Sequence, residues 1–306
     1  MRRHWLTALA AALATLAVVG SLSFAARRAG PAAHGPGQPG PGAPTASPPA
    51  DPAALVVRDG DTVEASGAVV QVPGKPPRFC APAPVAAVGS IDGRPQTCQM
   101  GVDLAGLDAT RLGPDGRALL RGTLRGGVLQ ITDQGPVRPE PTTGFDWRVP
   151  CPPPDGGWNR GRPDDNGLHE FIYNEHPDWF RDLRVTYPDG EPGAATDGPQ
   201  PRTVFVVEIV IADHAAAERA VRARYAGDVC FVANPGAKSL ADQQRDLERV
   251  RAVVERLMQE PANGIYTMRG GDAVELDMVA LTPPLLERLE PVLRLIVANP
   301  WLRPVR

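Results

Sequence analysis

The feature that most constrains this chain is an uncharged apolar run over residues 5–26, with two Arg residues shortly before it and two directly after it. A helix of this length, at about 1.5 Å per residue, covers the roughly 30 Å hydrocarbon core of a membrane. We therefore predict a signal-anchor, a single transmembrane helix, within residues 1–28. Cleavage as a secretory signal is the alternative, because Ser23 to Ala26 resemble the small residues of a cleavage site.

The chain after this run is expected on the extracytoplasmic side of the cell membrane. Only four residues precede the run, too few for a cytosolic domain. Residues 29–52 are rich in Pro and Gly and cannot bury a core, so we predict a disordered linker there. If the signal is cleaved instead, the same domains would be secreted.

The charge of the expected extracytoplasmic part limits its partners. Four of the 32 basic residues and none of the 35 acidic residues precede position 51, which leaves 28 basic against 35 acidic residues, a net charge of −7. Nucleic-acid-binding surfaces are usually basic. We therefore expect no nucleic-acid partner.

Four cysteines follow the apolar run: Cys80, Cys98, Cys151 and Cys230. Their number is even, and disulfides persist outside the cytoplasm. Three pairings are open, and the spacing favours Cys80 with Cys98 and Cys151 with Cys230. The sequence contains no Cys-x-x-Cys pair, which is the close spacing that a cysteine metal site would need.

Residues 53–135 read as a small all-β domain. Short runs with alternating apolar residues are separated by turn signals such as Asp59-Gly60 and Gly126-Gly127. Five or six strands in so short a stretch predict a small barrel, similar to an OB fold. Phe79 is its one aromatic residue, which argues against stacking on single-stranded nucleic acid.

The remaining chain divides into a connector and a second domain. Residues 136–201 form a Pro/Gly-rich connector with an aromatic island over 168–187, which we expect to pack against the second domain. Residues 202–306 predict an α+β domain, with helices on one face of an antiparallel or mixed sheet. Its expected elements are strands 203–212 and 228–233, helices 214–225 and 240–260, a hairpin over 264–281 and a helix over 283–297.

One cluster of His and carboxylate residues could bind a metal. It contains Asp164, Asp165, His169, Glu170, Glu175 and His176. The two His residues are seven positions apart, whereas the helical zinc motif places them four apart. We interpret the cluster as a solvated polar helix, and a metal held by His169, Glu170 and His176 is the weaker hypothesis.

A second group of carboxylates, Asp272, Glu275 and Asp277, lies along the predicted hairpin. Glu275 and Asp277 share one face of a strand. Paired carboxylates can perform acid–base chemistry only where their pKa values are separated in a cleft. An exposed polar strand face is the preferred interpretation.

The sequence contains no Gly-x-Ser-x-Gly elbow, no Ser-x-x-Lys motif and no P-loop, and the catalytic residues remain unknown. We therefore predict a membrane-tethered extracytoplasmic binding protein without a cofactor, which contacts a protein, a peptide or an envelope component. The alternative is a metal-assisted hydrolase that uses the cluster from His169 to His176.

Overall fold

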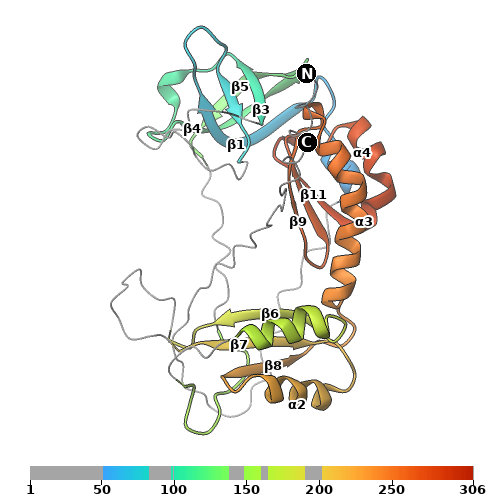
Figure 1. Cartoon of the computed structure of the whole chain (residues 1–306). Coiled ribbons are helices and arrows are strands. Elements are labelled where there is room, and N and C mark those ends of the chain that lie inside the picture. The colour runs from blue at the N-terminus through green and yellow to red at the C-terminus, as the bar shows by residue number, and fades with distance from the viewer. Residues whose placement is uncertain are drawn as a thin grey trace, which may run out of the picture.

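The computed structural model describes residues 51–82, 98, 100–137, 148–159, 165–189 and 202–305, and these form a mixed α+β protein with several sheets and four α-helices (Figure 1). The predicted transmembrane helix and nearly all of the predicted linker lie outside these residues. Among the helices that are described, none has the length and apolarity needed to cross a membrane.

The first sheet is closed. Its strand order is β12-β1-β2-β3-β5-β4, and β4 also pairs with β1. All neighbours are antiparallel except β3 and β5, which are parallel. The strands are β1 (Thr62–Val70), β2 (Arg78–Cys80), β3 (Gly101–Ala105), β4 (Arg117–Arg125), β5 (Val128–Gly135) and β12 (Arg303–Pro304), with short 3-10 helices at Pro52–Leu55 and Ala109–Arg111.

Alternation along β1 explains the core of this closed sheet. Every second residue from Val63 to Val69 is buried, as expected for a strand with one face inward. The pairing of β4 with β5 shifts between Arg121 and Gly122, because β5 carries a bulge there that leaves Thr132 without a partner in the register. A Cβ atom at Gly122 would overlap the carbonyl of Gln130, so only glycine fits there.

The C-terminal residues complete the core of the closed sheet. β12 pairs with the first half of β1, and Leu302 is fully buried in the same core. The indole Nε1 of Trp301 donates a hydrogen bond of 2.7 Å to the carbonyl of Ser66, and its ring centroid lies 4.5 Å from that of Phe79. Residues 301–304 therefore pack with the β-rich region, although the sequence groups them with the second domain.

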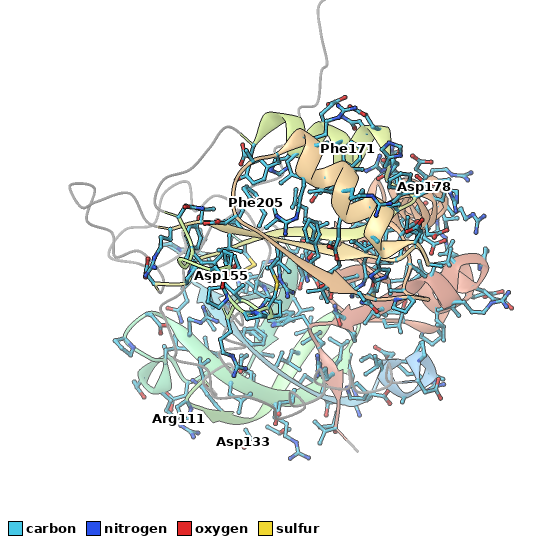
Figure 2. All side chains as sticks on the ribbon, turned by 90° about the horizontal axis from the view of Figure 1, so that it is seen from below. Arg111, Asp133, Asp155, Phe171, Asp178 and Phe205 are labelled. Carbon is cyan, nitrogen blue, oxygen red and sulfur yellow. A yellow bond between two sulfur atoms is a disulfide. The ribbon has the colours of Figure 1, made fainter. Side chains whose placement is uncertain are left out.

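The second sheet contains β6 (Phe180–Thr186), β7 (Val204–Ile209) and β8 (Val229–Ala233). All six residues of β7 are buried, as the continuous apolar run predicts. One face is covered by α1 (Asn166–Glu170), which continues as a π-helical turn (Phe171–Glu175), and by α2 (His214–Arg224). Phe171 and Phe205, both labelled in Figure 2, lie in this core.

The third sheet contains β9 (Ile265–Arg269), β10 (Val274–Met278) and β11 (Ile296–Pro300). It packs against α3 (Leu240–Met258) and α4 (Pro283–Leu289), with 3-10 turns at Pro261–Asn263 and Glu290–Leu295. The predicted capping box of α3 is confirmed by reciprocal hydrogen bonds between Ser239 and Asp242. α3 runs from the second sheet to the third (Figure 1).

Two details of the predicted second domain are wrong. Residues 202–306 do not form one sheet, because β6 from the predicted connector pairs with β7, and β9 to β11 form a separate sheet with its own core. The predicted helix over 283–297 ends at Leu289 and gives way to a 3-10 turn and β11. Pro291 contributes to this end, because its nitrogen carries no N–H that could continue the α-helical hydrogen bonds.

Candidate functional site

A cleft of 310 Å³ lies along the outer edge of β8, and we name it the β8 cleft. This volume is at the lower end of the range for small-ligand sites, about 300 to 1,000 Å³. The cleft combines aromatic, proline and charged side chains. Its lining residues are Cys151, Pro152, Pro154, Trp158, Glu218, Arg222, Gly227, Asp228, Val229 and Phe231.

The floor of the β8 cleft is an unpaired strand edge. Among the described residues, β8 pairs only with β7, in parallel. The amide of Phe205 donates to the carbonyl of Asp228 at 3.0 Å, and the amide of Asn234 donates to the carbonyl of Ile209 at 2.9 Å. Because alternate residues of a strand point to opposite sides, the amides and carbonyls of Val229, Phe231 and Ala233 point away from the sheet.

One wall of the β8 cleft is helix α2. Its first turn is capped by Asp213, whose side chain accepts a hydrogen bond of 2.9 Å from the amide of Ala216. Ala217 and Val221 are buried against the sheet. The residues that directly follow them in the helix, Glu218 and Arg222, line the cleft.

The Arg222 guanidinium faces an aromatic ring of the floor. Its Cζ atom lies 5.0 Å from the centroid of the half-buried Phe231 ring, which is cation–π geometry. The Arg222 side chain is exposed, and no carboxylate of the described residues forms an ion pair with it. Glu218 is half-buried, and it too has no ion-pair partner among the described residues, so both charges can contact a ligand.

The other wall is the 148–159 segment, which covers the opposite face of the sheet. Val149, Cys151 and Trp158 pack against a core that contains Val204 and Val206. Asp155 is an exposed residue of this segment and is labelled in Figure 2.

Two connections hold this wall to β8. The first is the disulfide from Cys151 to Cys230. In the second, the carboxylate of Asp228 accepts hydrogen bonds from the Asn159 amide at 2.5 Å and from its side-chain Nδ2 at 2.8 Å. The wall is therefore fixed near both of its ends.

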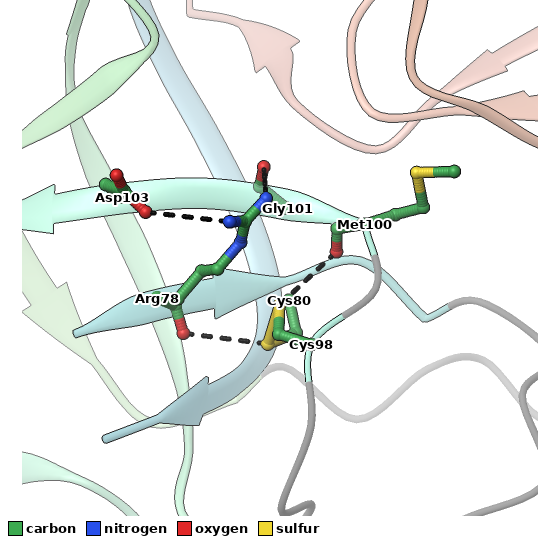
Figure 3. The surroundings of a disulfide bond; sticks show 6 residues. All are labelled: Arg78, Cys80, Cys98, Met100, Gly101 and Asp103. Atoms are coloured by element: carbon green, nitrogen blue, oxygen red, sulfur yellow. Dashed lines mark hydrogen bonds and ion pairs between the residues drawn. A yellow bond between two sulfur atoms is a disulfide. The ribbon is translucent and has the colours of Figure 1, made fainter. Parts of the chain in front are cut away.

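The predicted disulfide pairing is confirmed. Cys151 is joined to Cys230, and Cys80 is joined to Cys98 in the closed sheet (Figure 3). Beside the Cys80–Cys98 bridge, Arg78 Nη2 donates to the carbonyl of Gly101 at 3.3 Å. This bridge lies on β2 and plays no part in the β8 cleft.

The two His residues of the predicted cluster contact different groups. The His169 ring stacks on Tyr173, with centroids 5.7 Å apart, whereas the His176 ring lies 4.1 Å from that of Trp179. His176 follows the π-helical turn, which removes the regular helix that would place both rings on one face.

The carboxylates of that cluster have partners of their own. Glu170 accepts a hydrogen bond of 2.7 Å from Asn174, and Glu175 forms an ion pair of 2.9 Å with Arg224. The Asp165 carboxylate lies 3.8 Å from His169 Nε2, and Asp164 is outside the described residues. Over the part of the chain that the structure describes, no three His, Cys, Asp or Glu side chains form a group suited to a metal.

The carboxylates of the hairpin form ion pairs with arginines. Arg269 binds Glu275 at 2.9 Å and Asp277 at 2.5 Å across the hairpin. Asp272 binds Arg181 of β6 through two hydrogen bonds of 2.6 and 3.2 Å. The Arg181 hydrogen bonds lower the pKa of Asp272. These contacts favour the interpretation of a polar strand face.

Sequence reasoning missed a second pair of carboxylates, Asp182 and Glu208, which lie opposite each other on β6 and β7. Glu208 is almost fully buried and binds Arg181 at 2.5 Å. Burial and the neighbouring Glu208 charge raise the pKa of Asp182. Arg181 binds both Glu208 of the second sheet and Asp272 of the β9–β10 turn, so its role is to link these two parts of the structure.

We expect Asp182→Asn to stabilise the protein at pH 7. A raised pKa in the folded state means that the ionised Asp182 destabilises the fold, and this cost is present above the folded pKa and absent below the ordinary value of 3.8. The gain should therefore shrink as the pH falls toward 3.8. Urea unfolding at several pH values measures it, with the exposed Asp178→Asn as control. A less stable Asp182→Asn variant at pH 7 would contradict this expectation.

The chain matches no protein-family model, no curated protein and no solved structure. Its function is therefore inferred from its sequence and the geometry of its site. The sequence held one signal for the β8 cleft: the predicted bridge from Cys151 to Cys230 brings Trp158 and its neighbouring prolines close to a core strand.

Proposed function

We propose that this chain is a membrane-tethered extracytoplasmic binding protein and that the β8 cleft is its binding site. The observation that carries the proposal is an unpaired strand edge at the bottom of a cleft with aromatic and charged walls. The two disulfides are compatible with an extracytoplasmic location. The apolar run within residues 1–28 supports the membrane tether.

The closed sheet is proposed to be an OB-like barrel that supports the rest of the protein. Its order β1-β2-β3-β5-β4, closed by β1 with β4, is consistent with a five-stranded Greek-key barrel. Phe79 is buried and packs on Trp301, so neither ring is a free platform for a base. Together with the acidic net charge, this argues against a nucleic-acid ligand.

A metal-assisted hydrolase at His169, Glu170 and His176 is not favoured by any contact of the described residues. The two His rings pack on Tyr173 and on Trp179. The binding function therefore remains the proposal.

Site-specific photo-crosslinking in intact cells tests the proposed site. A photoreactive amino acid at Ala233, on the outward edge of β8, should give a defined adduct, whereas the same group at the exposed Val72 should not. Arg222→Glu should remove the adduct, because it reverses a charge in the cleft wall without changing a buried residue. Equal adducts from both positions, no adduct from Ala233, or an adduct insensitive to Arg222→Glu would each refute the site.

A further inference from the structure

We infer that the ligand of the β8 cleft is an extended peptide, which adds to β8 as a further strand and places an acidic side chain against Arg222. This inference rests on the proposed binding function and names its ligand class. It follows from the main-chain groups of the floor and from the side chains of the two walls.

The floor offers a repeating pattern of hydrogen-bonding groups. Val229, Phe231 and Ala233 each direct one amide and one carbonyl outward, and no described residue bonds to these groups. Their spacing is that of every second strand residue, about 6.6 Å. Another extended main chain matches this spacing over its length, which is the basis of recognition by strand addition.

The walls lie on opposite faces of the sheet. α2 covers the face that contains Phe231, whereas Trp158 packs on the face that contains Cys230. Side chains of an added strand alternate between these two faces. The ligand should therefore alternate between side chains that meet charged groups of α2 and apolar side chains that meet Trp158 and its neighbouring prolines.

The charges of α2 have the spacing of an extended peptide. Glu218 and Arg222 are four residues apart on the helix, about 6 Å along its axis, and residues two apart in a strand are about 6.6 Å apart. α2 connects the parallel strands β7 and β8, so it runs alongside β8. The complementary peptide carries an acidic residue for Arg222, then an apolar residue, then a basic residue for Glu218.

Fluorescence anisotropy with a defined peptide tests the charge contact. The probe is the labelled, amidated heptapeptide SIDVKIS, and the purified full chain in detergent should bind it saturably below about 1 mM. Replacing the aspartate of the probe by lysine should weaken binding about tenfold, and Arg222→Glu should restore binding of that lysine peptide. Absence of saturable binding, or absence of this rescue, would overturn the assigned contact.

Methylation of the probe amides tests the strand addition. In an added strand, the amides of alternate residues point to β8, so one alternate set is needed and the other is not. Methylating the needed set should weaken binding at least about tenfold, and the other set less than about twofold. If both sets tolerate methylation while Arg222→Glu still matters, strand addition is wrong and the binding site stands. If the probe fails but the Ala233 adduct persists, the ligand class alone is wrong.

Discussion

Replacing Phe79 by Ala is expected to lower the free energy of unfolding by about 3 to 5 kcal/mol. The side chain has no exposed surface, so its removal leaves a cavity in the core of the closed sheet. The contact with Trp301, at a centroid distance of 4.5 Å, adds about 0.5 to 1.5 kcal/mol for an aromatic pair. Such a loss is a large fraction of the about 5 to 15 kcal/mol that stabilises a typical protein.

Urea unfolding followed by circular dichroism measures this effect. Val72→Ala is the matched control, because that side chain is 42% exposed, and it should change stability by less than about 0.5 kcal/mol. The double variant with Trp301→Ala should lose less than the sum of the two single losses, since the rings are in contact. A loss below about 1 kcal/mol for Phe79→Ala would contradict the packing of Phe79 in this core, and additive losses in the double variant would contradict its contact with Trp301.

Removing the bridge between Cys151 and Cys230 should cost about 4.5 kcal/mol by the loop-entropy relation, because it closes a loop with a sequence separation of 79. The variant combines Cys151→Ser with Cys230→Ala, so that no free thiol remains at the site. Its second effect is local. Asp228 and Asn159 would be left to hold the wall of the β8 cleft, so trypsin should cleave faster after Arg148.

The bridge between Cys80 and Cys98 provides the matched control. It closes a shorter loop, with a separation of 18, and its removal should cost about 3 kcal/mol by the same relation. Because it lies on β2, cleavage after Arg148 should stay at the rate of the unmodified protein. Equal cleavage rates in the two bridge variants, or free thiols at these positions in the native chain, would contradict the role given to the Cys151–Cys230 bridge.

Local patterns in the sequence determined much of the secondary structure. The apolar run at β7, the helix after Asp213, the capping box at Ser239 and the hairpin of β9 and β10 are all present. Each depends on residues within a few positions of one another. The spacing of the cysteines also favoured the observed pairing among the three that the sequence left open.

Only the tertiary structure decided which strands share a sheet and which side chains meet in a site. Trp301 bonds to Ser66 across 235 residues of sequence, and no local pattern marks either residue for that contact. β6 lies in a stretch rich in turns, and its pairing with β7 depends on a buried partner surface. The β8 cleft arises because α2 and the 148–159 segment cover opposite faces of one edge strand. Strand propensity is local, whereas the choice of a pairing partner is a property of the folded chain as a whole.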